Sequence, residues 1–98
     1  MLYVVARITA QPDRYAFVRD AMLELTQTSR LETGCMRYDL LEDETRHVFV
    51  TREEWRTAEN EEAHMQGAAV ARVLAAAGDA LASPPDILRM SAVSISQG

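Results

Sequence analysis

Residues 35–55 read CMRYDLLEDETRHVFVTREEW, and this stretch decides the fold. Its side chains alternate along residues 35–41 and again along residues 47–55, with the period of two that is typical of β-strands. Between the two segments lies EDET, a short polar run that suits a turn. A turn of this length brings its two strands side by side, so the stretch predicts an antiparallel β-hairpin.

The sequence before the hairpin predicts a strand and a helix. Residues 2–9 alternate in the same way as the two hairpin segments. Asp13 is a good N-cap, and apolar residues then recur at helical spacing until near Glu32. Gly34 follows, and glycine most easily takes the left-handed conformation just past a helix. We therefore expect a helix that Asp13 caps and that ends near Glu32.

The sequence after the hairpin predicts a second helical region and a last strand. Thr57 can cap this region, whose first turns carry several Glu residues. Gly67 is expected to kink or divide it. The run SPP at residues 83–85 ends it, and residues 87–95 predict the last strand.

The order of these elements predicts an α+β fold of the ferredoxin-like type, β-α-β-β-α-β. A chain of 98 residues can build one core, so we expect a single domain over residues 1–98, with a four-stranded antiparallel sheet and the helices on one face. Whichever way the register falls, the other face would expose several of the following residues: Tyr3, Val5, Val48, Phe49 and Val50. Such a face favours association, which predicts a homodimer through the sheet faces.

The composition narrows the range of partners. The formal net charge is -5, all ten basic residues are Arg, and the absence of Lys excludes a Schiff-base lysine. An acidic chain without a basic cluster offers no surface for nucleic acid. Because the sequence shows neither a signal peptide nor an apolar run of membrane length, we expect no membrane partner and a cytoplasmic location. Cys35 is the only cysteine, so we expect no internal disulfide and no multi-cysteine metal site.

Three motifs together resemble a known family. The pattern E-x-G-C-x-x-Y occupies residues 32–38, E-x-W occupies residues 53–55, and His64 follows nine residues later. Their order and spacing are similar to those of the antibiotic biosynthesis monooxygenase superfamily of dimeric α+β barrels, and the resemblance covers essentially the whole chain. That family includes cofactor-free oxygenases of quinols and aromatic polyketides, haem-degrading enzymes, and an isomerase of a small phosphorylated dione.

His64 is the residue whose interpretation depends most on the resemblance. A lone histidine on a helix is more often structural than functional. The resemblance implies instead that His64 removes a phenolic proton as a general base, and Glu61, three residues earlier, could orient its ring. The pair Glu-x-x-His occurs once, whereas di-iron helical sites need it twice, and no nucleotide motif is present. We therefore expect neither a metal nor an organic cofactor.

The last strand of the hairpin carries residues with two possible roles each. Trp55 either fills the end of the core or forms the wall of a flat aromatic pocket, which Thr51 and Glu53 share because they lie on the same strand face. Glu53 either forms a buried ion pair with Arg7 or Arg37, or orients the histidine or a substrate hydroxyl. Tyr38, on the partner strand, either packs in the sheet or donates its hydroxyl to a ligand.

The first functional hypothesis is a cofactor-independent monooxygenase that oxidises a hydroquinone, or a related phenolic or polyketide substrate, with O2. His64 would take the phenolic proton, the resulting anion would pass an electron to O2, and the radical pair would recombine to a peroxide that collapses to the quinone. The residues expected to hold the ring are Trp55, Tyr38, Phe49 and Met65.

Two alternatives use the same fold. One is an isomerase of a small phosphorylated dicarbonyl, with His64 as base and Arg7 or Arg37 binding the phosphate. The other is a non-catalytic module that binds a small ligand. Haem degradation is not expected, because Ala6 stands where the haem-degrading members carry an Asn. Asn60 and Glu61 replace an apolar pair that is usual in the family, which predicts a more polar pocket.

Overall fold

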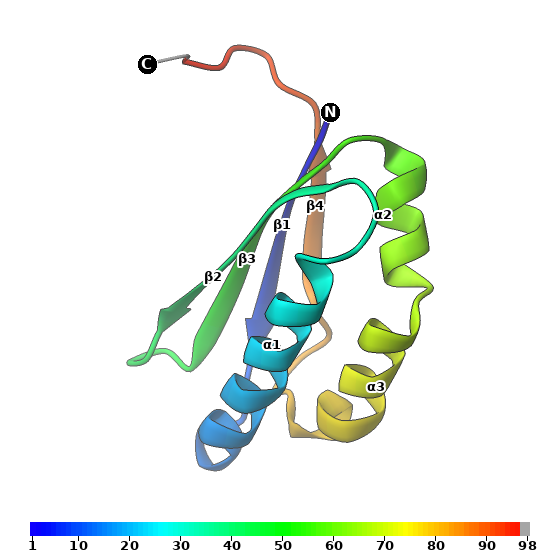
Figure 1. The fold of residues 1–98 in the computed structure, drawn as a ribbon. Coiled ribbons are helices and arrows are strands. Elements are labelled where there is room, and N and C mark those ends of the chain that lie inside the picture. The colour runs from blue at the N-terminus through cyan, green and yellow to red at the C-terminus, as the bar shows by residue number, and fades with distance from the viewer. Residues whose placement is uncertain (97–98) are drawn as a thin grey trace.

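The computed structural model describes residues 1–96 and has the predicted α+β architecture (Figure 1). In chain order, the strands and α-helices are β1 (Leu2–Thr9), α1 (Tyr15–Ser29), β2 (Cys35–Asp43), β3 (Val48–Trp55), α2 (Ala58–Met65), α3 (Ala68–Ala77) and β4 (Asp86–Met90). Short 3-10 turns at Pro12–Arg14 and Gly78–Ala80 precede α1 and follow α3. The ferredoxin-like order is confirmed, with the second helical region in two pieces.

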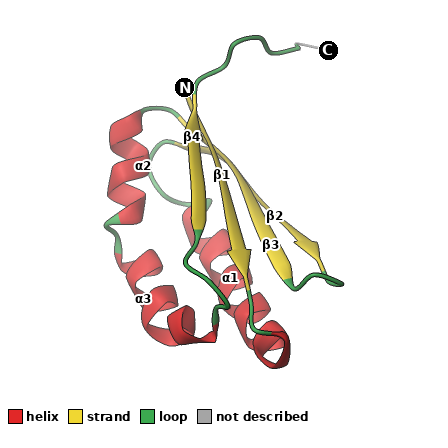
Figure 2. Ribbon diagram, turned by 180° about the vertical axis from the view of Figure 1, so that it is seen from behind, coloured by secondary structure: helices red, strands yellow, loops and turns green. Residues whose placement is uncertain are grey.

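The four strands form one antiparallel sheet in the order β2-β3-β1-β4. The helices cover one face, and within residues 1–96 no helix covers the other (Figure 1 and Figure 2). The register pairs Glu53 with Val4 on one side and with Tyr38 on the other. Ala6 and Thr51 are paired in the next row that faces the helices. The sheet thus gathers side chains that lie far apart in the sequence.

Two of the predicted helix boundaries are confirmed and two are wrong. The Thr57 hydroxyl accepts a hydrogen bond from the Asn60 backbone N–H at 3.1 Å, so Thr57 caps α2, and Gly67 separates α2 from α3. Asp13, by contrast, lies inside the 3-10 turn, and α1 begins at Tyr15 without a side-chain cap. The helix also ends at Ser29, earlier than predicted. No helix within residues 1–96 is long and apolar enough to cross a membrane.

The last strand is shorter than predicted. β4 covers Asp86–Met90 rather than residues 87–95. The cause lies in its partner, because β4 pairs only with β1 and the final pair of that ladder joins Met90 to Tyr3. In this antiparallel ladder the residues after Met90 would have to pair with the residues before Tyr3. β1 begins at Leu2, so residues 91–96 have almost no strand left to pair with.

The core lies between the sheet and the helices. Its main cluster includes Val18, Met22, Phe49 and Val70, and Phe49 stacks on Tyr15 with ring centroids 4.9 Å apart. A smaller cluster joins Val4, Tyr38 and Trp55. Both clusters contribute residues to the wall of the cavity described next, among them Val18, Met22 and Val4.

Candidate functional site

A cavity of about 270 Å³ lies between the sheet and the three helices. Apolar side chains from β1, α1, α3 and β4 form most of its wall. The polar side chains in the lining are Tyr38, Thr51, Glu53 and His64. They come from β2, β3 and α2, so polar groups reach the cavity from one part of its wall.

His64 is held in this wall by a residue that precedes β2. Its ring atom Nδ1 lies 2.6 Å from Glu32 Oε1, and the imidazole is buried while the Glu32 side chain stays partly exposed. A carboxylate can only accept a hydrogen bond, so Nδ1 carries the hydrogen, and in the neutral imidazole Nε2 is left with its lone pair. Within residues 1–96 Nε2 makes no hydrogen bond. It is therefore the ring atom available to a ligand in the cavity.

The contact between Glu32 and His64 depends on a tight packing of Gly34 against α2. Gly34 has φ 80°, and a Cβ atom there would collide with the Asn60 side chain. The Gly34 carbonyl also accepts a hydrogen bond from the Arg56 N–H at 2.8 Å. These contacts fix the loop that carries Glu32 beside the start of α2.

A second polar group is built around Glu53, which is buried. Its Oε1 accepts a hydrogen bond from Trp55 Nε1 at 2.8 Å, and its Oε2 accepts one from Thr51 Oγ1 at 2.6 Å. The Thr51 hydroxyl in turn accepts from the Ala6 N–H at 3.2 Å. The carboxylate thus satisfies the buried indole N–H, which would otherwise lack a partner.

Aromatic rings enclose the polar end of the cavity. The Trp55 and His64 ring centroids are 4.7 Å apart, and the Tyr38 ring meets His64 edge-on at 5.7 Å. Burial, and after it the charge of Glu53, raise the pKa of the Tyr38 phenol above its ordinary value. Tyr38 therefore stays protonated and can donate a hydrogen bond but cannot act as a base.

The structure brings together most of the residues predicted for the site. Tyr38, Thr51, Glu53, His64 and Met65 all line the cavity. Trp55 lies directly behind them, in contact with His64 and Glu53 rather than in the lining itself.

Two of the predicted site residues lie elsewhere. Phe49 is in the main core, stacked on Tyr15, and does not line the cavity. Arg7 is exposed on the opposite face of β1, because it alternates with Ala6 and Ile8, which line the cavity. The predicted ion pair of Glu53 with Arg7 or Arg37 is therefore wrong.

The predicted role of Glu61 is also wrong, since Glu32 and not Glu61 contacts His64. Glu61 instead accepts a hydrogen bond from Arg89 Nε at 3.0 Å, which joins α2 to β4. Neither Asn60 nor Glu61 lines the cavity, so they do not make it more polar. The signal for Glu32 was present in the sequence, because it opens the E-x-G-C-x-x-Y pattern, but its partner was not readable from it.

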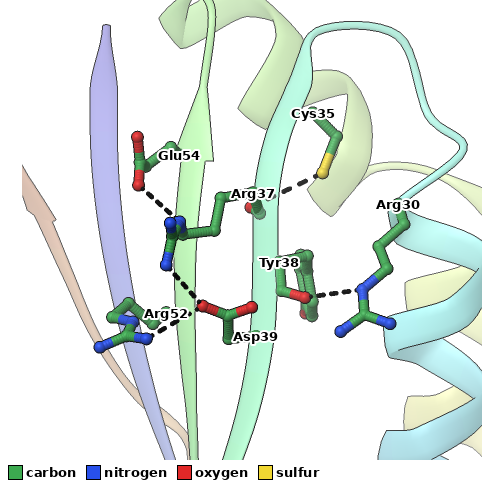
Figure 3. Close-up of polar contacts among 7 residues, drawn as sticks. All are labelled: Arg30, Cys35, Arg37, Tyr38, Asp39, Arg52 and Glu54. Carbon is green, nitrogen blue, oxygen red and sulfur yellow. Dashed lines mark hydrogen bonds and ion pairs between the residues drawn. The ribbon is translucent and has the colours of Figure 1, made fainter.

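The face of the sheet away from the helices carries a ladder of ion pairs on β2 and β3 (Figure 3). Arg37 lies 3.0 Å from Asp39 and from Glu54, and Arg52 lies 3.1 Å from Asp39. The hydrogen bond from Arg52 contributes most to holding the pKa of Asp39 below its ordinary range. Arg37 is therefore engaged on this face and does not reach the cavity.

Within residues 1–96, no three His, Cys, Asp or Glu side chains are grouped so as to hold a metal ion.

Comparison with known proteins points to one family. The sequence profile described as "Antibiotic biosynthesis monooxygenase" matches residues 1–76. No curated protein matches the chain in sequence. A solved structure from Pseudomonas aeruginosa is 29% identical with a TM-score of 0.84, over 95% of this chain and 94% of that one.

Two further solved structures extend the likeness. One, described as antibiotic biosynthesis monooxygenase, is 26% identical with a TM-score of 0.89, over 96% of this chain and 100% of that one. A Mycobacterium tuberculosis protein, 23% identical with a TM-score of 0.89 over 98% of each chain, shows a likeness of fold alone.

Proposed function

The chain belongs to the antibiotic biosynthesis monooxygenase family, and on that premise we propose that it is a cofactor-independent monooxygenase that oxidises a phenol or hydroquinone with O2. The observation that carries the proposal is the His64 imidazole. It lies in the wall of an otherwise largely apolar cavity, bonded through Nδ1 to Glu32 and free at Nε2. This is the arrangement that a general base needs.

His64 and Glu32 would act as a pair. Nε2 takes the proton of the substrate hydroxyl, and the imidazolium that forms is stabilised by the carboxylate 2.6 Å from Nδ1. Glu32 also fixes the tautomer and the orientation of the ring. Glu32 is thus a positioning residue, which acts through His64 and does not touch the substrate.

The rest of the reaction takes its electrons from the substrate. The deprotonated ring passes one electron to O2, and the radical pair joins at a ring carbon that bears hydrogen. The hydroperoxide then loses water: the O–O bond breaks, one oxygen stays on the ring as a carbonyl, and the other leaves with the carbon's hydrogen and the proton that His64 returns. A phenol and O2 thus give a quinone and water.

The other residues around the cavity would orient the substrate. Tyr38 can donate a hydrogen bond to a ring oxygen, because it stays protonated. Glu53 holds the Trp55 indole against His64, and Met65 contributes a soft apolar wall. The isomerase alternative lacks what it needs, because within residues 1–96 no Arg lines the cavity to bind a phosphate.

We also propose that the protein is a homodimer in which the uncovered sheet faces pack together. Support comes from the apolar side chains of β1 and β4 on that face, where Leu88 is 55% exposed. Tyr3 is paired with Met90, and Val5 with Leu88, so these residues form a continuous apolar strip. Light scattering at micromolar concentration tests this, and a monodisperse monomer would rule it out.

The proposed activity is tested by incubating the purified protein with 1-naphthol, and separately with menadiol, in the presence and absence of O2. We expect quinone formation and O2 uptake in equal amounts, faster than autoxidation and proportional to enzyme concentration, and no conversion without O2. Conversion that proceeds anaerobically would contradict an oxygenase. Metal analysis and an absorbance spectrum of the same sample check that no metal or organic cofactor takes part.

A further inference from the structure

The cavity is polar at one end and apolar along the rest of its length, and we infer from this that it takes a compact, uncharged aromatic ligand with a single hydrogen-bonding group. The inference rests on the proposed function for the identity of the site, but it concerns binding and can be tested without turnover. It separates simple phenols from diols, whose second hydroxyl would lie in the apolar part, and from acidic ring compounds.

The polarity follows from the strand register. Glu53 and Tyr38 share the row of Val4, and Thr51 lies in the next row, opposite Ala6. The following row that faces the helices holds the apolar residues Ile8 and Phe49. Glu42 is in the same row, but it accepts a hydrogen bond from Tyr15 and lies outside the lining. All polar lining groups therefore sit toward the start of β1, where α2 adds His64 (Figure 1).

The far end of the cavity offers little to a second polar group. Its wall is made by side chains of α1, α3 and the segment that leads into β4, including Val18, Ala77, Leu81 and Pro85. A ligand hydroxyl buried there would lose its water partners without gaining a side-chain partner, which weakens binding. The hydroxyl of a monophenol can instead sit beside His64 with the ring in the apolar part.

Charge and size narrow the ligand further. Within residues 1–96 the lining contains no Arg, and the chain has no Lys. Arg89 is paired with Val4 in the polar row, but it is bonded to Glu61 and lies outside the lining. Because the carboxylate of Glu53 does line the cavity, an anionic ligand is disfavoured. The volume of about 270 Å³ lies just below the range of roughly 300–1,000 Å³ for small-molecule pockets. One or two fused rings fit this description better than a long substituted chain.

The test is an anaerobic NMR titration of the wild-type protein with 1-naphthol, naphthalene, 1,5-dihydroxynaphthalene and 1-naphthoate. Trp55 is the only tryptophan, so its indole N–H gives one side-chain signal, and this group donates to Glu53 at the polar end of the cavity. We expect 1-naphthol to bind most tightly. Naphthalene and the diol should bind about 5-fold more weakly or worse, as one lost hydrogen bond implies, and naphthoate about 100-fold more weakly.

Two variants locate the effect. His64→Leu should abolish the preference for 1-naphthol over naphthalene, whereas the matched control His47→Leu, at the other histidine and outside the lining, should keep it. The inference is overturned if the diol or naphthoate binds as tightly as 1-naphthol, or if no ligand shifts the indole signal. If the binding order holds but no ligand is turned over in air, the inference stands and the proposed function fails. If phenol and diol bind equally tightly and are turned over equally fast, the proposed function stands and the inference about the ligand fails.

Discussion

The two faces of the sheet surround their polar side chains differently, as the adjacent residues Glu53 and Glu54 show. Glu53 points toward the helices, is buried, and accepts hydrogen bonds from the uncharged donors Trp55 and Thr51. Glu54 points the other way, stays partly exposed, and pairs with Arg37. On the helix side, polar groups are fixed by neighbours and shape a cavity, whereas on the other side they neutralise one another on the surface.

The apolar residues of the two faces differ in the same sense. Those facing the helices are covered by the chain itself, as Val4 and Phe49 show. Those on the other face, such as Leu88 and Met90, remain exposed beside the ion-pair ladder. The comparison teaches that one face is completed by the chain's own helices and carries the candidate site, while no helix within residues 1–96 covers the other, which is the face assigned to the proposed dimer.

The largest effect that tests the difference between the two faces is expected from Val5→Arg, which should weaken the proposed dimer. If the uncovered face is a dimer interface, this change places one unpaired charge from each molecule inside it, which costs several kcal/mol. The dimer dissociation constant should rise at least about 10³-fold. Analytical ultracentrifugation measures it, with Leu31→Arg at a residue that is 88% exposed as the control. An unchanged dimer in Val5→Arg would show that the molecules associate elsewhere.

The next largest effect concerns the neighbouring glutamates. Glu53→Ala leaves the buried Trp55 N–H and the Thr51 hydroxyl without their acceptor, so unfolding free energy should fall by about 2–4 kcal/mol. Glu54→Ala removes only a surface ion pair and should cost about 1 kcal/mol or less. Urea unfolding at one fixed protein concentration compares them. Similar losses in both variants would contradict the difference between the faces.

A smaller effect is expected when Glu32 loses its charge. Glu32→Gln keeps an acceptor for Nδ1 but exchanges a charge-assisted hydrogen bond for a neutral one, so kcat should fall about 10-fold with little change in KM. The control is Glu61→Gln, which keeps the bond from Arg89 and should leave kcat nearly unchanged. The nitrogen shifts of the His64 ring should also show a weaker preference for the Nδ1–H tautomer. If kcat falls more in Glu61→Gln than in Glu32→Gln, Glu61 and not Glu32 orients the His64 ring.

The smallest effect is the response of the tyrosines to alkali. Partial desolvation, together with a hydrogen bond to Glu42, raises the pKa of Tyr15 to about 12, and burial raises that of Tyr38 as well. In the unfolded chain both groups lose their protons near the ordinary value of about 10. Rising pH above that value therefore favours the unfolded state, and stability should fall. Tyrosinate absorbance should show Tyr15→Phe removing a late step, and a Tyr15 step at the ordinary value would contradict the hydrogen bond from this hydroxyl to Glu42.

Much of the fold could be predicted from the sequence because it depends on local patterns. Alternation defined the hairpin and β1, and the capping hydroxyl of Thr57 and the break at Gly67 were readable where they stand. The end of β4 was not, because it depends on where its partner β1 begins. A strand boundary set by a neighbour leaves no mark in the strand's own residues.

The candidate site was predictable to a similar degree. The sequence could place Glu53 and Thr51 on one strand face and His64 on the following helix, because these positions follow from the periods of strands and helices. It could not pair His64 with Glu32, which is 32 residues away, because that contact arises from the packing of the loop at Gly34 against α2. The nearer glutamate on the same helix was the obvious partner and is bonded elsewhere.

The central claim is that the helix-covered face carries a catalytic base, and the turnover of phenols by His64→Gln tests it most directly. Gln can still donate to Glu32 from its amide but cannot take a proton. Per folded molecule, as judged by the indole signal of Trp55, His64→Gln and His64→Ala should lose about 10²-fold or more in rate, while His47→Gln should retain the wild-type rate. Full turnover by both His64 variants above the autoxidation background would show that His64 is structural and that the proposed mechanism is wrong.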